Sequence, residues 1–408
     1  MAQSPGVTSG VPGAAARPLS PEELASHYRS FRVSDRILLT GHSHQAWPDT
    51  ALSGMERAWR DAAEQVDEKW DRAFEVAERV RAGWRALLND PSGYIALGQN
   101  TFELVARFLS ALPLSNRPRL VTTDGEFHTI RRLLARLEEE GVEVIRVRTA
   151  QVADVADAVA QAVDDRTAAV LMSSVLFRNA HIVPGLDIVA EACARVGAEL
   201  LVDTYHHLNA VPFSLGGLDL EGAFVVGGGY KYCQLGEGNC FLRFPRECSL
   251  RPVLTGWFAE FGALASDGPG GSVEYAEGSG RFAGATYDPV SHYRAEAVFG
   301  FFAEHGLTPP ALRRLSQRQV CRLAAAIDAL DVDPSLLSRD RSVGLEDIGG
   351  FLSLETPRAS QLSEALRARG VSTDVRGSLL RLGPAPYVTD AQLDHAVSGL
   401  AEALIEST

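Results

Sequence analysis

The sequence contains very little lysine. Lys69 and Lys231 are the only two, so the 39 basic residues include 37 arginines. We interpret this skew as codon pressure in a GC-rich genome, which replaces dispensable lysines by arginine. A retained lysine is therefore a candidate for chemistry that needs an unprotonated amine. Lys69 lies among Asp67, Glu68 and Asp71, a pattern typical of ion pairs on a helix surface, which leaves Lys231 as the chemical candidate.

Paired cysteines and long apolar runs are also lacking. The five cysteines are an odd number and form no CxxC pair, so we expect no zinc site and no redox disulfide. No apolar run approaches the roughly 18 to 20 residues of a membrane helix. Residues 1–17 have neither the basic start nor the apolar core of a signal peptide. These absences favour a cytoplasmic protein with no membrane partner and no bound metal.

An excess of positive charge is missing as well. The 52 acidic residues outnumber the 39 basic ones, for a formal net charge of -13, and no Lys/Arg cluster stands out. We therefore expect no nucleic-acid partner. The 408 residues, 46% apolar and 22% charged, have the composition of a folded protein of two or three domains, which excludes a fibrous repeat or wholesale disorder.

Short apolar runs alternate with helical stretches from Tyr94 onward. Strands separated by helices of this length predict a mainly parallel sheet covered on both faces, whose ligands bind beyond the carboxyl ends of the strands. Before them, residues 52–88 carry apolar positions at helical spacing and predict one long helix or a helical pair. The expected strands are 94–97, 119–123, 142–147, 168–172, 199–202 and 224–226.

The pattern changes after about Pro289 to helices with two isolated strands. We therefore predict a flexible tail over residues 1–20, a large domain with an N-terminal segment over 21–290, and a small C-terminal α+β domain over 291–408. The helices expected in the small domain are 292–305, 311–330, 361–369 and 391–405, and its strands are 351–354 and 379–382.

Two consecutive strands deliver a carboxylate and an amine to the same sheet edge. The strand 199–202 is followed by Asp203, and the strand 224–226 is followed by three glycines, Tyr230 and Lys231. Pyridoxal phosphate requires this pair: an amine for its aldehyde and an anion for its ring nitrogen. A plain Asp203–Lys231 salt bridge is the structural alternative, but the glycines before the lysine indicate a close approach of the backbone to another group.

These segments resemble the fold-type-I, aminotransferase class V enzymes that use pyridoxal phosphate, and among them kynureninase most. The motifs that carry the resemblance run in kynureninase order: Asp203-x-x-His206, Tyr230-Lys231-Tyr232 before a glycine-containing turn, and Thr255-Gly256-Trp257. The resemblance implies a large domain with a mainly parallel, seven-stranded sheet, a small C-terminal domain, a homodimer and an amino-acid substrate.

The resemblance also assigns roles to residues. Lys231 would hold the cofactor aldehyde and move protons at Cα and C4′, while Asp203 pairs with the pyridine nitrogen. Tyr230 and Trp257 match positions that bind the cofactor phosphate, and the tyrosine would also protonate the product carbanion. His206 matches a position that borders the cofactor, and Thr286 one that reaches the phosphate of a neighbouring subunit.

Further residues are expected around the cofactor. Asn100 and Thr101 begin a helix whose N-terminus offers amide donors to a phosphate, with Thr101 as the expected hydroxyl ligand or a plain N-cap. Phe127 falls where the family places an aromatic ring on the cofactor face, although phenylalanine is also common in cores.

Three residues are candidates for contact with the substrate. Arg381 lies in an apolar strand and matches the arginine that receives the substrate α-carboxylate. His42 and His44 lie near a segment that approaches the substrate in kynureninases, and two histidines alone make a poor metal site.

The chain departs from kynureninase in the ring and substrate regions. Ile130 replaces the usual aspartate after Phe-x-Thr, and His42-Ser43-His44-Gln45 replaces Asn-Ser-Leu-Gly. We expect a kynureninase-like hydrolase that cleaves the Cβ–Cγ bond of an L-kynurenine-type amino acid, with a C–S lyase, an aminotransferase or an epimerase as alternatives. Cys321 falls in an apolar helical pattern and is expected to be buried, which disfavours a cysteine desulfurase.

Overall fold

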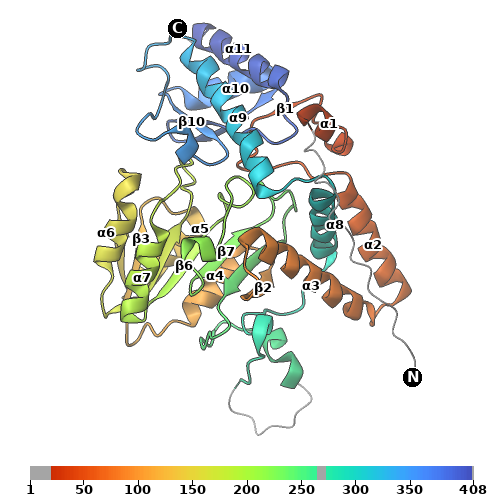
Figure 1. The fold of residues 1–408 in the computed structure, drawn as a ribbon, viewed down its shortest axis with the longest axis vertical. Helices are drawn as coiled ribbons and strands as arrows, with labels where there is room; N and C mark the ends of the chain where they lie inside the picture. The colour runs from red at the N-terminus through yellow and green to blue at the C-terminus, as the bar shows by residue number, and fades with distance from the viewer. Residues whose placement is uncertain (1–19, 264–272, 407–408) are drawn as a thin grey trace, which may run out of the picture.

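The computed structural model describes residues 20–263 and 273–406, so the tail predicted over 1–20 lies almost wholly outside the described residues. A seven-stranded sheet with the order β2-β8-β7-β6-β5-β3-β4 forms its centre (Figure 1). Among these strands β8 is antiparallel to both of its neighbours, while the chain from β4 to β7 is parallel. The strands are β2 (Tyr94–Gly98), β3 (Arg119–Thr123), β4 (Glu143–Val147), β5 (Thr167–Ser173), β6 (Glu199–Asp203), β7 (Phe224–Gly228) and β8 (Cys240–Phe244).

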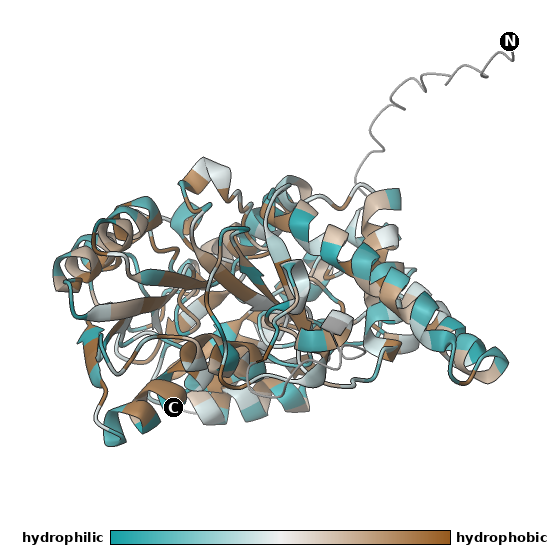
Figure 2. Ribbon diagram, turned by 90° about the horizontal axis from the view of Figure 1, so that it is seen from below, coloured by the Kyte–Doolittle hydropathy of each residue, from teal (hydrophilic) through white to brown (hydrophobic). Residues whose placement is uncertain are grey.

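Two separate apolar clusters cover the two faces of this sheet. In β5, Val170 belongs to one cluster and Leu171 to the other, as alternation along a strand requires. Every residue of β5, β7 and β8 is buried, which explains their continuous apolar runs. Figure 2 shows apolar strands inside and polar helix surfaces outside. The helices that cover the sheet are α4 (Thr101–Ser110), α5 (His128–Glu139), α6 (Val155–Ala162) and α7 (Leu186–Val196).

The interval 52–88 forms a helical pair, α2 (Thr50–Glu64) and α3 (Lys69–Leu88). Helix α8 (Val290–Glu304) packs against both of them. A Cβ at Gly54 would lie 2.4 Å from the carbonyl oxygen of Tyr293, so a glycine is required for this close helix contact. The helix that the predicted boundary assigned to the small domain therefore contacts the N-terminal helices.

The small domain pairs three helices with a four-stranded antiparallel sheet of order β12-β13-β10-β9 (Figure 1). Its helices are α9 (Pro309–Asp328), α10 (Ala359–Ala368) and α11 (Asp390–Glu406), and its strands are β9 (Ser338–Arg339), β10 (Leu352–Glu355), β12 (Asp374–Arg376) and β13 (Leu379–Leu382). Across residues 20–263 and 273–406 no helix is long and apolar enough to cross a membrane.

The N-terminal segment after the short helix α1 (Pro21–Ala25) connects the two parts of the molecule. Strand β1 (Ile37–Leu38) pairs with β11 (Val371–Ser372) of the small domain. A few residues later, the amide of Gln45 donates to the carbonyl of Tyr230 at 3.2 Å, and Gln234 Nε2 donates to Gln45 Oε1 at 2.8 Å. Residues 37–45 thus link the small domain to the turn that holds Lys231.

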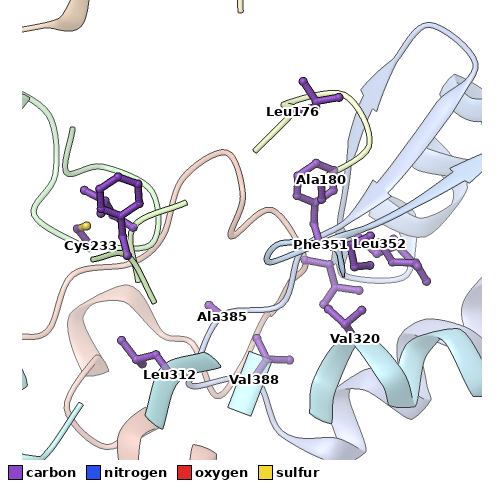
Figure 3. Packing of buried hydrophobic residues seen from close by; sticks show 14 of the residues in the cluster. Leu176, Ala180, Cys233, Leu312, Val320, Phe351, Leu352, Ala385 and Val388 are labelled. Atoms are coloured by element: carbon purple, nitrogen blue, oxygen red, sulfur yellow. The ribbon is translucent and has the colours of Figure 1, made fainter. Parts of the chain in front are cut away.

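A continuous apolar core joins the two domains. Figure 3 shows Leu176 and Ala180, from the loop after β5, beside Phe351 and Leu352 at the start of β10. Val320 of α9 packs below them. These residues are all almost fully buried, so the small domain is held against the carboxyl-end edge of the large sheet.

Candidate active site

The two strand ends singled out in the sequence meet at one cavity. Asp203 ends β6, and Tyr230 and Lys231 follow the end of β7. All three line a cavity of about 430 Å³, within the range of small-molecule sites. The first turn of α4 and the residue before α5 close it from the other side. Its remaining lining residues include Phe102, Thr129, Ser173, Val175, Tyr205, Glu237 and Gly238.

Lys231 is buried among rings at the base of this cavity. Its Nζ lies 2.7 Å from Nε2 of His206, and 4.7 and 5.3 Å from the ring centres of Tyr205 and Phe127. Burial lowers the pKa of Lys231, and the nearby Asp203 opposes this only in part. No Lys231–Asp203 ion pair within 4 Å occurs among the ion pairs of the described residues, so the structural alternative of a plain salt bridge is not found.

Asp203 is fixed by the backbone beyond its strand. Its Oδ1 accepts the amide hydrogen of Tyr205 at 2.8 Å. Burial raises the pKa of Asp203, whereas the amide hydrogen bond and the charge of Lys231 lower it. A buried carboxylate held at this position is suited to receive an N–H donor from a ring in the cavity.

One ring nitrogen of His206 has no hydrogen-bond partner among the described residues. Burial, followed by the charge of Lys231, lowers the pKa of His206 well below its usual value, so the ring is neutral at pH 7. Its Nε2 faces Lys231, and its buried Nδ1 has no hydrogen-bond partner in the described part of the chain. An orphaned buried nitrogen beside the cavity indicates that a further polar group belongs there.

The three glycines before Tyr230 have a packing role. A Cβ at Gly228 would lie 2.4 Å from the hydroxyl of Tyr205, and one at Gly229 would lie 2.6 Å from Leu235. The close approach inferred from the sequence is real, but the approaching groups are protein side chains.

The N-terminus of α4 faces the cavity with Asn100 and Thr101. Oδ1 of Asn100 accepts the amide of Glu103 at 2.9 Å, so Asn100 is the N-cap and Thr101 is the first helical residue. The N-cap reading of Thr101 was therefore wrong. The remaining first-turn amides have no partner within the helix, although the Thr101 amide is hydrogen-bonded to Cys240 outside it. Such a helix end is the kind of place where proteins bind anions.

Aromatic rings form the walls of the cavity. Phe127 and Phe177 make an edge-to-face contact with ring centres 5.4 Å apart. Tyr230 lies 4.9 Å from Tyr205, and burial raises the pKa of Tyr230 to about 12, so its hydroxyl keeps its proton at pH 7. The cavity thus combines a flat apolar interior with one phenolic acid.

Two of the predicted substrate residues lie behind the cavity wall. His42 is buried, stacks on Phe351 at 4.5 Å, and places Nε2 3.3 Å from Oδ2 of Asp374. Arg381 is buried in β13 and donates to the carbonyl of Phe177 and to Asp374. Neither side chain is among the lining residues of the cavity.

The third predicted substrate residue, His44, lies on the surface. Its ring is stacked on Tyr230 with centres 4.9 Å apart, and its Nε2 lies 3.9 Å from Oε1 of Glu237. Since Tyr230 and Glu237 both line the cavity, His44 is placed at its mouth.

Trp257 and Thr286 are not brought to Lys231 of the same chain. Trp257 begins the 3-10 segment 257–263 and is 44% exposed. Thr286 lines a second cavity of about 520 Å³ that shares only Gln99 with the first.

Sequence reasoning missed several residues of the site. Tyr205 and Phe177 form cavity walls, and Glu126 is buried against Ser173 behind it. Asp374 joins His42 to Arg381. The signal available for Tyr205 was its place two residues after Asp203, but Asp374 lies in a strand too short to be recognised.

Two cysteines bear on whether the protein uses a nucleophilic thiol. Cys321 is exposed on α9, so the expectation that it is buried was wrong. Cys240 lines the cavity, and burial raises its pKa to about 12. A cysteine held as a neutral thiol is a poor nucleophile.

Known proteins similar to this chain are enzymes of the expected group. An uncharacterized aminotransferase of Bacillus subtilis is 23% identical over 93% of this chain and 98% of its own. Kynureninase of Pseudomonas fluorescens is 25% identical over 95% of this chain and 94% of its own. Kynureninase of Bacillus cereus is 26% identical over 56% of this chain. No family model matches the sequence.

Solved structures share the fold. The apo cysteine desulfurase of Thermococcus onnurineus superposes with a TM-score of 0.80 at 15% identity and covers 96% of this chain and all of its own. A mutant of C-DES with glycine covalently linked to its PLP cofactor gives 0.79 at 14% identity, over 92% and 98% of the two chains. These likenesses confirm the predicted α/β fold of type I. Together with the sequence relatives, they agree with pyridoxal phosphate as the expected cofactor.

Proposed function

We propose that the protein is a pyridoxal-phosphate enzyme that hydrolyses the Cβ–Cγ bond of an L-kynurenine-type amino acid, giving alanine and an anthranilate-type acid. The observation that carries the proposal is the meeting of Lys231 and Asp203 in one aromatic cavity at the carboxyl edge of the sheet. The similarity to Pseudomonas fluorescens kynureninase over nearly the whole chain favours this reaction among those of the fold.

The residues of the cavity fit the cofactor. Lys231 would hold its aldehyde carbon, Asp203 its ring nitrogen, and the first turn of α4 with Thr101 its phosphate. Phe127 supplies an apolar face for the ring, and the orphaned Nδ1 of His206 offers a polar contact. When bound, the cofactor supplies an electron sink for the carbanion formed at the substrate Cα.

Lys231 and Tyr230 have the properties needed to move the protons. The lowered pKa of Lys231 favours a neutral amine, which is the form that takes a proton from Cα. The hydroxyl of Tyr230 retains its proton at pH 7 and donates it to Cβ when the bond to the carbonyl carbon breaks. A water molecule adds to that carbonyl carbon, so the products are the aromatic carboxylate and alanine.

The substrate contacts are proposed from the resemblance to kynureninase. Arg381 is proposed to receive the α-carboxylate, with His42 supporting it through Asp374. The rings of Phe177 and Tyr230 suit an aryl ketone, and His44 lies over Tyr230 at the mouth.

We also propose a homodimer in which Trp257 and Thr286 act on the partner's cofactor phosphate. Their position away from Lys231 of their own chain supports this role, as does the exposure of Trp257.

The test is a substrate panel of kynurenines and cysteine conjugates given to the purified protein loaded with pyridoxal phosphate. Anthranilate fluorescence together with alanine, and no pyruvate, is the expected result. Pyruvate with a thiol identifies a C–S lyase, for which the solved structure of a cystine C–S lyase at TM-score 0.76 is the supporting likeness. An α-keto acid with loss of the visible cofactor band identifies an aminotransferase. Either of these results overturns the hydrolase.

A further inference from the structure

Asp374 contacts two arginines and a histidine. It is the first residue of β12, and its Oδ2 contacts Nη2 of Arg381 and lies 3.3 Å from Nε2 of His42. Its Oδ1 accepts from Nη1 of Arg376 at 3.1 Å. Arg381 is 2% exposed, so its contact with Asp374 lies in a poorly solvated environment, whereas the side chain of Arg376 is 41% exposed.

Two of the five N–H groups of Arg381 are occupied by protein acceptors in this arrangement. Its Nη1 donates to the carbonyl of Phe177 and its Nη2 to Asp374, while its buried Nε has no hydrogen-bond partner among the described residues. A planar guanidinium binds a carboxylate best through two parallel N–H donors. An incoming α-carboxylate that takes the Nη1 and Nη2 donors together therefore competes with the groups that Arg381 now holds.

The charges of the cluster favour such an exchange. Two guanidinium groups face one carboxylate, because burial and Arg381 lower the pKa of His42 to about 4 and leave its ring neutral. One net positive charge thus remains in the cluster, and its Arg381 donates to the carbonyl of Phe177, a residue that lines the cavity. A second carboxylate balances it, and Asp374 need not be left alone because Arg376 already holds its other oxygen.

We propose that Asp374 occupies Arg381 as an internal carboxylate in the substrate-free protein, and that the α-carboxylate of the amino acid displaces it onto Arg376. Asp374 and Arg376 are then positioning residues that set the affinity and the carboxylate selectivity of the site. The inference rests on the proposed role of Arg381 and is independent of which bond the enzyme cleaves.

The test is a binding titration of the protein loaded with pyridoxal phosphate, followed by the change of the visible cofactor band. The probe is L-alanine, and L-alaninamide is the control without a carboxylate. In Asp374→Asn the competitor for Arg381 is neutral, so the Kd for L-alanine falls about tenfold. In Arg376→Gln, Asp374 loses its alternative partner and the Kd rises about tenfold. L-alaninamide binds both variants as it binds the wild type.

A second measurement avoids the cofactor and guards against a poorly folded variant. Propionate is added to the cofactor-free protein and the melting temperature is followed, with the circular-dichroism spectrum as a check of folding. Propionate raises the melting temperature of Asp374→Asn more than that of the wild type, and that of Arg376→Gln less.

Several outcomes overturn the proposal. If Asp374→Asn binds L-alanine as weakly as the wild type, more weakly or not at all, Asp374 does not compete with the substrate. Equal effects on L-alaninamide remove the carboxylate from the explanation. If Arg381→Gln leaves L-alanine binding unchanged, the proposed role of Arg381 fails with it. A failure to cleave kynurenines changes none of these readouts, so the two proposals fail separately.

Discussion

Burial changes what the amine of Lys231 can do. An exposed lysine is protonated at pH 7 and is a poor nucleophile, whereas Lys231 is 5% exposed and its pKa is lowered. The neutral ring of His206 at 2.7 Å adds no positive charge of its own. The side chain is therefore able to attack an aldehyde and later to accept a proton.

Replacing Lys231 tests this at the residue scale. Lys231→Arg keeps a positive side chain but removes the nucleophilic amine, so the protein loaded with pyridoxal phosphate is expected to lack the visible band of the lysine-linked cofactor. Activity falls at least about 10³-fold because Lys231 is also the proton carrier. Absorbance and turnover are measured together with circular dichroism.

The other lysine of the chain, Lys69, provides a matched control for this substitution. Lys69 begins α3, and its Nζ donates to the carbonyl of Val66 at 2.6 Å. Lys69→Arg is expected to keep both the absorbance band and the activity. An unchanged band in Lys231→Arg would show that the cofactor is not attached there.

At the scale of elements, the start of α4 uses one residue to cap the helix and the next residue to line the cavity. Asn100 caps the helix through Glu103, whereas Thr101 offers its hydroxyl to the cavity. Thr101→Val is expected to weaken cofactor binding about tenfold and to leave the stability of the cofactor-free protein unchanged. Asn100→Ala removes the cap and lowers the free energy of unfolding by about 1 kcal/mol.

The matched variant here is Asn100→Asp. Aspartate caps as well as asparagine, so stability is retained, but its charge opposes a phosphate at the same helix end. Equilibrium dialysis of pyridoxal phosphate and urea unfolding separate the two effects. A loss of stability in Thr101→Val equal to that in Asn100→Ala would contradict the division of roles.

Strand β8 depends on a buried ion pair. Nε of Arg243 donates to Oδ2 of Asp90 at 2.6 Å, and both side chains are at most 3% exposed. Its Nη1 also donates to the carbonyls of Glu221 and Ala223. Asp90→Ala leaves a buried, unpaired charge and is expected to lower the free energy of unfolding by about 3–5 kcal/mol.

An exposed ion pair provides the comparison. Glu191 and Arg195, one turn apart on α7, are 3.3 Å apart, and both are largely exposed. Glu191→Ala is expected to change stability by no more than about 0.5 kcal/mol. Urea unfolding of the two variants side by side measures the difference, and equal losses would show that burial is not the cause.

The elements that the sequence predicted are those with strong patterns. The strands that end near Asp203 and Lys231 follow from short apolar runs, so the pairing of these two residues was predictable. Strand β8 was not predicted, and nothing in its five residues encodes its antiparallel direction within the sheet. Asp374 was missed because β12 has three residues, and only tertiary contacts bring it to Arg381.

At the scale of the whole molecule, buried histidines make stability depend on pH. Burial lowers the pKa of His42 and His207 to about 4 and of His292 to about 3, against an ordinary 6.5. The unfolded chain therefore binds more protons than the folded one below pH 6.5, so stability falls as the pH decreases towards 4. Glu126, whose pKa burial raises to about 7, acts in the opposite direction and offsets part of the loss.

Each of the three histidines is expected to cost about 2 kcal/mol of stability at pH 5. Urea unfolding of the cofactor-free protein at pH 7 and pH 5 measures the total. His292 lies at the second cavity, which does not include Lys231, so His292→Gln tests one contribution in the cofactor-free protein without altering the surroundings of Lys231. This variant should lose about 2 kcal/mol less than the wild type between the two pH values. Equal losses would exclude His292 as a source.

Residues 37–45 give the fold one more property. This stretch pairs with β11 on one side, and on the other its Gln45 is hydrogen-bonded to Tyr230 and Gln234, which flank Lys231. A rigid-body rotation of the small domain would displace residues 37–45 and, through Gln45, tilt the turn that holds Lys231. Rotation of the small domain and orientation of the Lys231 amine thus depend on the same main-chain segment. Proteolytic cleavage within residues 37–45 would uncouple the two.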